Sequence, residues 1–393
     1  MLVRYYGHVG LPTGYGDAAN EICMAMLEVG IELEISTDGD QLPARYLPLA
    51  THIKNEGELS PDPDVVIVHT LPLDCAKVLA ASRVREFYPR AACIAYTTWE
   101  GIAAPKSVTD ALSVFHQVWV PSQQTRDAIG KGPRAGGGGV AWCAVVPHAY
   151  DPSTEEDRYD VHPPYYLPEA PGTYRFYTLG AWVTRKNIDC VVRAYLRAFT
   201  PADDVELVVQ SAGADRTACL FSQISTGLTL AETPKVTFSH ERISEEQIWS
   251  IHRECDCYVT ATRGEAWNLP AFDAMLAGRH IIAPSEMGHD DFLGKTSAWL
   301  YWSRTVASGG EIRLSQDPKA PTGTVLARYV GTQGITVRTE WRDPEVMRLA
   351  ALMRSAYDQR LSHLTVNYNP SDLFSREAVG ETIRNLLKGT TLV

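Results

Sequence analysis

The sequence of 393 residues has no long hydrophobic run. Its longest run of Val, Ile and Leu alone, Val65 to Val68, is far shorter than the about 20 apolar residues that a membrane-spanning helix needs. The first residues, MLVRYYGHVG, lack the apolar segment of a signal peptide and fit a buried strand instead. We therefore expect a cytoplasmic protein without a membrane span.

Metal-binding and disulfide patterns are also missing. Eight cysteines are scattered, and only Cys255 and Cys257 stand close together, so neither the CxxC spacing of zinc sites nor a dense disulfide framework is present. Asp290 and Asp291 are adjacent, so their side chains diverge instead of sharing a divalent cation. We expect reduced thiols, no metal and no resident cofactor.

Acidic side chains outnumber basic ones, which gives a formal net charge of -11. This balance argues against a general surface for polyanions, so nucleic acid is a disfavoured partner.

The length suits two α/β domains better than one core. Short β-branched runs alternate with longer amphipathic segments, which is typical of strands and crossover helices in a parallel sheet. A polar, Pro-rich stretch at 151–172 separates the halves. We predict Rossmann-like domains over 1–165 and 166–370, with a C-terminal helix at 371–393 packing back on the first.

The pattern also places individual elements. A helix is expected near 344–361, 303–335 is too irregular to assign, and the glycine run at 136–139 is expected to be a loop. The expected strands are Leu2–Tyr6, Glu32–Ile35, Val65–Val68, Cys93–Tyr96, Val118–Val120, Cys143–Val146, Arg175–Leu179, Val205–Gln210, Cys257–Thr260 and Ile281–Ala283, with helices at Asn187–Phe199 and Leu269–Ala277.

A glycine-containing loop, GLPTGYGDAANE at 10–21, follows the first strand and opens a helix. Gly14, Gly16 and Ala19 match the dinucleotide fingerprint, and Asp38 lies about where an acid would meet a ribose, which would favour an NAD(P)-dependent oxidoreductase. However, seven residues separate Tyr6 from Gly14, which is too many for the tight turn of that fingerprint. The loop instead fits a flexible lip over a ligand, or a helix N-terminal turn with Asp17 near its cap.

Two adjacent cations, Arg185 and Lys186, precede an amphipathic helix in YTLGAWVTRKNIDCVVRAYLRAF. Positive charge at a helix start is unfavourable against the macrodipole, so these side chains need a reason to be there. A bound diphosphate would supply it, because helix N–H groups and cations both bind phosphate oxygens. The alternative is that both side chains simply reach solvent.

Two acids stand in the run RGEAWNLPAFDAMLAG at 263–278. Pro270 suits the first turn of a helix, which places Glu265 on the preceding loop and Asp273 on the helix itself. Alone, Asp273 could simply interact with the helix N-terminus and Glu265 could face solvent. Together with the strand before them, they lie at the carboxyl edge of a sheet, where ligands of open α/β folds bind.

These residues carry a resemblance. The run from Arg263, continued by MGHDDF, resembles the donor-binding segment of retaining glycosyltransferases of the GT-B fold, in particular the large glycosyltransferase family 4. WVPS at 119–122, VVPHAYDP at 145–152, the RKN turn and EEQIWSIHRECDCYV follow the family's order, so the resemblance covers most of the chain. It implies two Rossmann-like, doubly wound domains facing a central cleft, the first for the acceptor and the second for a nucleotide-sugar donor.

In that family two acids separated by seven residues hold the sugar nucleotide. The resemblance implies that Glu265 binds sugar hydroxyls, that backbone N–H groups near Asn268 and Leu269 approach phosphate, and that Asp273 accepts from the ribose diol. The family usually has Glu at the second acid, so the side chain of Asp273 is one methylene shorter.

The resemblance also implies retention of anomeric configuration, with Lys186 and Arg185 stabilising the departing diphosphate. The family's arginine after the turn glycine is replaced by Ala181. The leaving phosphate can take the acceptor proton; Glu100 would assist, or is a capping or surface acid. No metal is required.

The first domain would supply Gly14 and Gly16 to the donor and the aromatic side chains of Tyr15 and Trp99 to the acceptor. Trp99 lies in YTTWEG, where many family members have a histidine near the sugar.

The sequence thus favours a retaining, metal-independent glycosyltransferase using a UDP or GDP sugar. The acceptor could be a glycan, small molecule, lipid or hydroxymethylated DNA base, with the first two preferred. The alternatives are an NAD(P)-dependent oxidoreductase and a GT-B sugar-nucleotide epimerase or binder.

Overall fold

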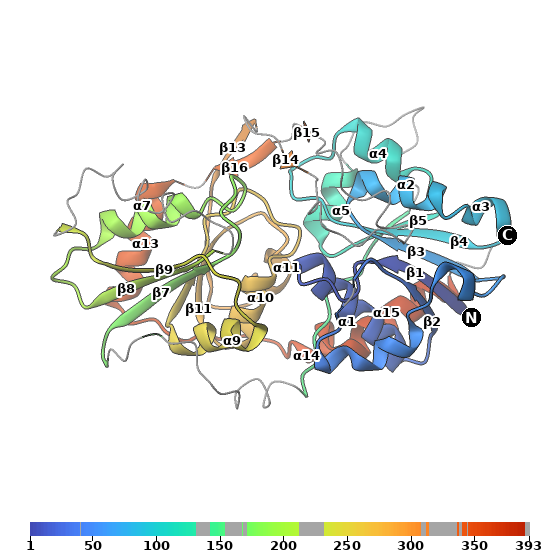
Figure 1. Cartoon of the computed structure of the whole chain (residues 1–393). Helices are drawn as coiled ribbons and strands as arrows, with labels where there is room; N and C mark the ends of the chain where they lie inside the picture. Colours follow the sequence, from blue (N-terminus) through green and yellow to red (C-terminus); the bar gives the residue numbers. More distant parts are fainter. Residues whose placement is uncertain are drawn as a thin grey trace. The chain divides into compact units, whose positions relative to one another are not determined.

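The computed structural model describes residues 1–39, 41–130, 142–153, 167, 171–211, 232–307, 312–313, 336–337, 340–343 and 345–389. The chain divides into two compact units (Figure 1). The first is Met1–Pro152, Ser308–Thr339 and Asn369–Val393; the second is Ser153–Ala307 and Glu340–Tyr368. The expected boundary at 165/166, the glycine run at 136–139 and most of 303–335 lie outside the described residues.

The first unit contains a six-stranded parallel sheet of order β2-β1-β3-β4-β5-β6. Because helices cover both faces, β3 and β4 are buried at every position and read as continuous apolar runs. The strands are β1 (Leu2–Gly7), β2 (Glu32–Ser36), β3 (Val65–His69), β4 (Ala92–Tyr96), β5 (Gln117–Val120) and β6 (Cys143–Val145).

Helices α1 and α15 cover one face of this sheet, and α2, α4 and α5 cover the other (Figure 1). The helices of this unit are α1 (Gly14–Glu28), α2 (Pro72–Ala81), α3 (Val84–Phe87), α4 (Lys106–Leu112), α5 (Gln123–Gly130), α14 (Ser371–Phe374) and α15 (Arg376–Lys388), with 3-10 turns at Ala44–His52 and Glu56–Glu58.

The C-terminal helix α15 belongs to the first unit although it comes last in the chain. Buried Arg376 donates from Nε to Glu21 at 2.7 Å and from Nη1 to Asp151 at 2.6 Å. Gly380 lies so close to α1 that an added Cβ would be 2.3 Å from the carbonyl oxygen of Ala25. An ion pair and a glycine contact therefore fix this helix against α1.

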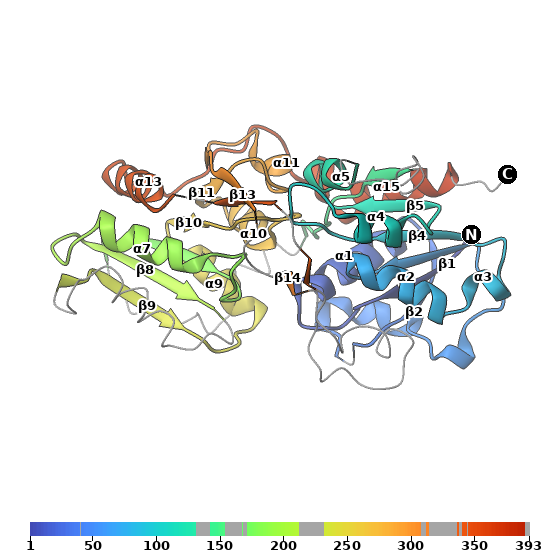
Figure 2. The same ribbon diagram turned by 90° about the horizontal axis from the view of Figure 1, so that it is seen from above.

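The second unit contains another six-stranded parallel sheet, of order β12-β11-β10-β7-β8-β9. Figure 2 shows α7 over β8, and their apolar side chains form one core with those of α13. The elements are β7 (Tyr174–Leu179), α7 (Ile188–Ala198), β8 (Val205–Gln210), β9 (Lys235–Ser239), α9 (Glu245–Glu254), β10 (Cys257–Val259), α10 (Leu269–Leu276), β11 (His280–Pro284), α11 (Asp290–Leu293), β12 (Trp299–Tyr301) and α13 (Val346–Asp358).

Two short antiparallel pairs complete the described strands. They are β13 (Arg304–Ala307) with β16 (Glu340–Asp343), and β14 (Ile312–Arg313) with β15 (Thr336–Val337).

Each parallel sheet has one point where the strand order reverses. It lies between β1 and β3 in the first unit and between β7 and β10 in the second. At such a point the loops after the two strands leave toward opposite faces of the sheet, and ligands of open α/β folds bind there. The loops after β7 and β10 carry the cations and the first acid singled out in the sequence.

The predicted fold class, two doubly wound Rossmann-like α/β domains, is confirmed. The predicted strands are all present, with ends that differ by a residue. The predicted last helix is divided at Ser375, whose hydroxyl caps α15. Among the described residues no helix is long and apolar enough to cross a membrane.

The close packing of α15 on α1 gives a stability prediction. Gly380→Ala should lower the free energy of unfolding by about 1–3 kcal/mol, because the new methyl group overlaps the Ala25 carbonyl. Gly130→Ala is the control: Gly130 ends helix α5, and a Cβ there meets nothing within 4 Å. Urea unfolding of both variants tests this, and equal stability of the two would contradict the packing described.

Candidate functional site

The loops after β7 (180–187) and β10 (260–268) are bonded to each other at the switch point of the second sheet. The backbone N–H of Arg263 donates to the carbonyl of Arg185 at 2.7 Å. The guanidinium of Arg185 in turn donates to the carbonyl of Gly264 at 2.8 Å. The two loops therefore form one structural element.

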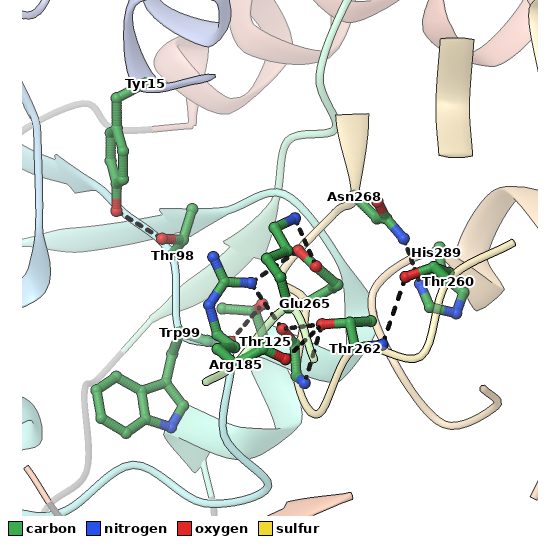
Figure 3. Close-up of polar contacts among 12 residues, drawn as sticks. Tyr15, Thr98, Trp99, Thr125, Arg185, Thr260, Thr262, Glu265, Asn268 and His289 are labelled. Carbon is green, nitrogen blue, oxygen red and sulfur yellow. Dashed lines mark hydrogen bonds and ion pairs between the residues drawn. The ribbon is translucent and has the colours of Figure 1, made fainter. Parts of the chain in front are cut away.

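Glu265 lies at the centre of this element and is 5% exposed. One carboxylate oxygen is 2.6 Å from Nζ of Lys186. The other is 3.0 Å from Nη1 of Arg185 (Figure 3). Burial alone would raise the pKa of Glu265, but the charges of Lys186 and Arg185, with hydrogen bonds from Lys186 and Thr262, lower it to about 2. The carboxylate is therefore ionised near neutral pH.

This ion cluster explains the two cations before α7. They precede the N-cap residue Asn187 and face the carboxylate of Glu265. The side chains of Lys186 and Arg185 remain 17% and 23% exposed, and the three charged groups together carry one net positive charge. Such a cluster still attracts an anion.

Helix α10 begins directly after this loop. Asn268 is its N-cap residue, in the left-handed conformation with φ 82°, and Pro270 occupies the first turn. Leu269, the first helical residue, is half-buried. The side chain of Asn268 is directed at the ring of His289 (Figure 3). No role for this histidine was predicted from the sequence.

Asp273 lies in the second turn of α10 and is half-buried. Burial raises the pKa of the Tyr258 hydroxyl, and the negative charges of Glu265 and Asp273 raise it further. Both acids of the sequence motif are therefore within electrostatic reach of one buried tyrosine, although Glu265 comes from the loop and Asp273 from the helix.

The candidate residues of the first unit follow β4 and open α1. The hydroxyl groups of Tyr15 and Thr98 are 2.5 Å apart (Figure 3). Burial raises the pKa of the Tyr15 hydroxyl, and the negative charge of Glu100 raises it further. Glu100 itself is half-buried. Trp99 has no exposed surface. A stacking role for its ring would require this loop to move.

Gly14 and Gly16 differ in their surroundings. Gly14 is the exposed first residue of α1. Gly16 is buried, its N–H donates to the Thr13 hydroxyl at 3.1 Å, and an added Cβ would be 1.9 Å from the carbonyl oxygen of Leu11. Packing of its own loop therefore requires a glycine at 16. The donor contacts expected of both glycines stay predictions.

A buried polar group at the switch point of the first sheet was missed by the sequence analysis. His8, one residue after β1, lies 2.9 Å through Nδ1 from Asp38 and 3.0 Å through Nε2 from the hydroxyl of Thr70. Asp38 is the acid that a dinucleotide site would use for ribose, and here it is buried and bonded to His8. A histidine placed directly after a strand was the available signal.

Metal-ligating residues form no cluster in the ranges that the structure describes: no group of three His, Cys, Asp or Glu side chains could hold an ion there. Asp290, one of the adjacent acids considered above, accepts from the backbone N–H of Glu286 at 2.7 Å.

Several solved structures resemble the chain over its whole length, among them the following three. HepE of Anabaena, in complex with UDP and glucose, is 14% identical, with 99% of this chain and 100% of that chain covered and a TM-score of 0.63. The lipopolysaccharide outer core galactosyltransferase WaaB is 11% identical, with 100% of both chains covered and a TM-score of 0.60. The α,α-trehalose 6-phosphate synthase of Burkholderia multivorans is 10% identical, with 99% and 98% covered and a TM-score of 0.58.

No family model matches the sequence, and neither does any curated protein. The structural likeness extends over both units and identifies the fold as GT-B.

The ion cluster makes a prediction about acid stability. The pKa of Glu265 falls from 4.5 to about 2 on folding, so its stabilising contribution is complete above pH 4.5 and is lost as the pH falls toward 2. Glu265→Gln should therefore destabilise the chain above pH 4.5 by on the order of 3 kcal/mol. Urea unfolding of both proteins across this range should show the difference shrinking with acid. A difference independent of pH would contradict the ion pairing.

Proposed function

We propose that this chain is a retaining, metal-independent glycosyltransferase. It transfers a sugar from a nucleoside diphosphate sugar, of UDP or GDP type, to an acceptor hydroxyl, and needs no resident cofactor. The observation that carries the proposal is the ion cluster at the switch point of the second sheet, in which buried Glu265 pairs with the partly exposed side chains of Lys186 and Arg185.

The cluster combines the two chemistries that a sugar nucleotide presents. Lys186 and Arg185 are pure hydrogen-bond donors with positive charge and suit phosphate oxygens. Ionised Glu265 only accepts, and therefore suits sugar hydroxyls. A diphosphate that binds Lys186 or Arg185 in place of Glu265 would leave a carboxylate oxygen of Glu265 available to accept a hydrogen bond from the sugar.

The same residues fit the proposed reaction. When the bond between the sugar and the diphosphate breaks, positive charge develops on the sugar and negative charge on the leaving group. Lys186 and Arg185 would stabilise the leaving group from fixed positions, while Glu265 remains next to the sugar. The departing phosphate would take the proton of the acceptor hydroxyl on the same face, with Glu100 as the alternative proton acceptor.

The structural neighbours support a sugar-nucleotide substrate. HepE was solved with UDP and glucose, WaaB is a galactosyltransferase and the third neighbour is a trehalose 6-phosphate synthase. Asp273 on α10 is proposed to bind ribose, and the N–H groups near Asn268 and Leu269 to approach phosphate.

The oxidoreductase alternative is weaker, because Asp38 is bonded to His8 and Gly16 is needed for loop packing. A sugar-nucleotide epimerase or binder would use the same cluster without transferring the sugar. For the acceptor we favour a glycan or small molecule because the chain is acidic, with net charge -11. Tyr15 is its proposed contact in the first unit.

Product analysis tests the activity. The full chain with UDP-glucose or GDP-mannose, a panel of acceptors and EDTA should release nucleoside diphosphate and form a glycoside with the anomeric configuration of the donor. Glu265→Ala should reduce the rate about ten- to a hundredfold, because charged hydrogen bonds to the sugar are lost. Inverted product, strict dependence on manganese or unchanged turnover in Glu265→Ala would each overturn the corresponding part of the proposal.

Calorimetry tests the phosphate contact. Lys186→Ala should raise the Kd of the nucleoside diphosphate about tenfold or more, since a charge-assisted bond is removed. Lys235→Ala is the matched control: Lys235 lies in the same unit, is 49% exposed and pairs with Glu206 at 3.2 Å. Equal affinity of the Lys186 variant and wild type would exclude Lys186 from the site.

A further inference from the structure

Asn268 occupies a capping position without capping the helix. An asparagine at the N-cap normally accepts a hydrogen bond from an amide of the first turn. Here α10 has no side-chain cap bond, although Asn268 is only 4% exposed. The backbone of Asn268 is left-handed, which asparagine tolerates better than most residues but glycine adopts freely. The side chain therefore serves some purpose other than helix capping.

His289 fixes which way the Asn268 amide points. Nε2 of His289 is 2.6 Å from the carbonyl oxygen of Pro284, which can only accept, so Nε2 carries a hydrogen. Burial lowers the pKa of His289, which favours the neutral ring with Nδ1 as an acceptor. Nδ1 lies 3.4 Å from Nδ2 of Asn268. The amide nitrogen therefore faces the histidine, and the amide oxygen faces away from it.

That amide oxygen is buried and has no hydrogen-bond partner among the described residues. Buried acceptors in folded proteins are nearly always bonded, so an unsatisfied oxygen marks a place where a partner is missing. The missing partner must be a hydrogen-bond donor.

The surroundings identify the chemistry of that donor. The backbone N–H of Gly288, next to His289 in the chain, donates to the backbone carbonyl of Glu265 at 3.0 Å, so the Asn268–His289 pair adjoins the ion cluster. Asn268 also ends the loop that carries Glu265. An amide oxygen repels phosphate oxygens, which are acceptors as well, and pairs with hydroxyl groups. This oxygen therefore complements the sugar part of a ligand whose phosphates face Lys186 and Arg185.

We propose that the amide oxygen of Asn268 accepts a hydrogen bond from a hydroxyl of the donor sugar. His289 is a positioning residue that holds the amide in this orientation. The inference rests on the proposed function and deepens it, because it assigns a specific discrimination to one side chain. Asn268 strengthens binding of the sugar nucleotide, and a nucleoside diphosphate without sugar gains nothing from it.

The experiment is calorimetry of UDP, UDP-glucose, GDP and GDP-mannose with wild type and Asn268→Gly. Glycine accepts φ 82°, removes the side chain and keeps the backbone N–H that is proposed to approach phosphate. The Kd of the sugar nucleotide should rise about 3- to 10-fold, as expected for one neutral hydrogen bond, and that of its diphosphate should not change. The diphosphate is thus the internal control for folding and for the phosphate site.

His289→Phe is the second variant. Phenylalanine retains a ring but has no nitrogen to hold the Asn268 amide, so the sugar nucleotide should again lose affinity while the diphosphate does not. Equal changes for both ligands in Asn268→Gly, or no change for either, would overturn the inference and leave the proposed function standing. Failure of wild type to bind all four nucleotides would overturn the proposed function, and this inference with it.

Discussion

The ionised carboxylate of Glu265, buried between Lys186 and Arg185, is the interaction on which the rest of the site depends. A buried charge without a partner would be strongly destabilising, so the three side chains must come together as the domain folds. Lys186 follows β7 and Glu265 follows β10, which lie side by side in the second sheet. The ion pairs therefore connect the loop after β7 to the loop after β10 at the switch point. Asn268 and the start of α10 follow Glu265 directly in the chain, so their position depends on the same contacts.

The site is divided by hydrogen-bonding character. Lys186 and Arg185 donate, whereas Glu265 and the oxygen of Asn268 accept. In the proposed function Lys186 and Arg185 bind phosphate, and Glu265 and the amide oxygen of Asn268 bind the sugar. In this structure the side chains of Lys186 and Arg185 are both paired with the carboxylate of Glu265. An incoming diphosphate would then replace one anion by another, which limits the desolvation that binding requires.

The fold could largely be predicted from the sequence because strands buried on both faces have a simple signature. Val65–Val68 and Ala92–Tyr96 are uninterrupted runs of mainly apolar residues between turn formers. The placement of Glu265 on a loop followed from Pro270 in the first turn of the next helix. Both inferences use only neighbouring residues.

Contacts between distant segments were harder to predict. Glu265 and Lys186 were both singled out, but their pairing depends on β10 lying beside β7, across 79 residues of sequence. The bond from His8 to Asp38 likewise requires β1 and β2 to be in register. The burial of Trp99 and the direction of the Asn268 side chain depend on packing that no local pattern records.

The central claim is that the second unit binds a nucleoside diphosphate and its sugar. Thermal unfolding of the full chain with UDP, GDP, ADP, the common sugar conjugates of each nucleotide, and NAD tests this claim most directly. A ligand at about a hundred times its Kd adds roughly 2.7 kcal/mol and shifts the midpoint measurably. We predict that the unfolding midpoint shifts with one nucleoside diphosphate and with the corresponding nucleotide sugar. A shift with NAD alone would contradict this claim and favour the oxidoreductase alternative, in which Gly14, Gly16 and Asp38 bind the dinucleotide.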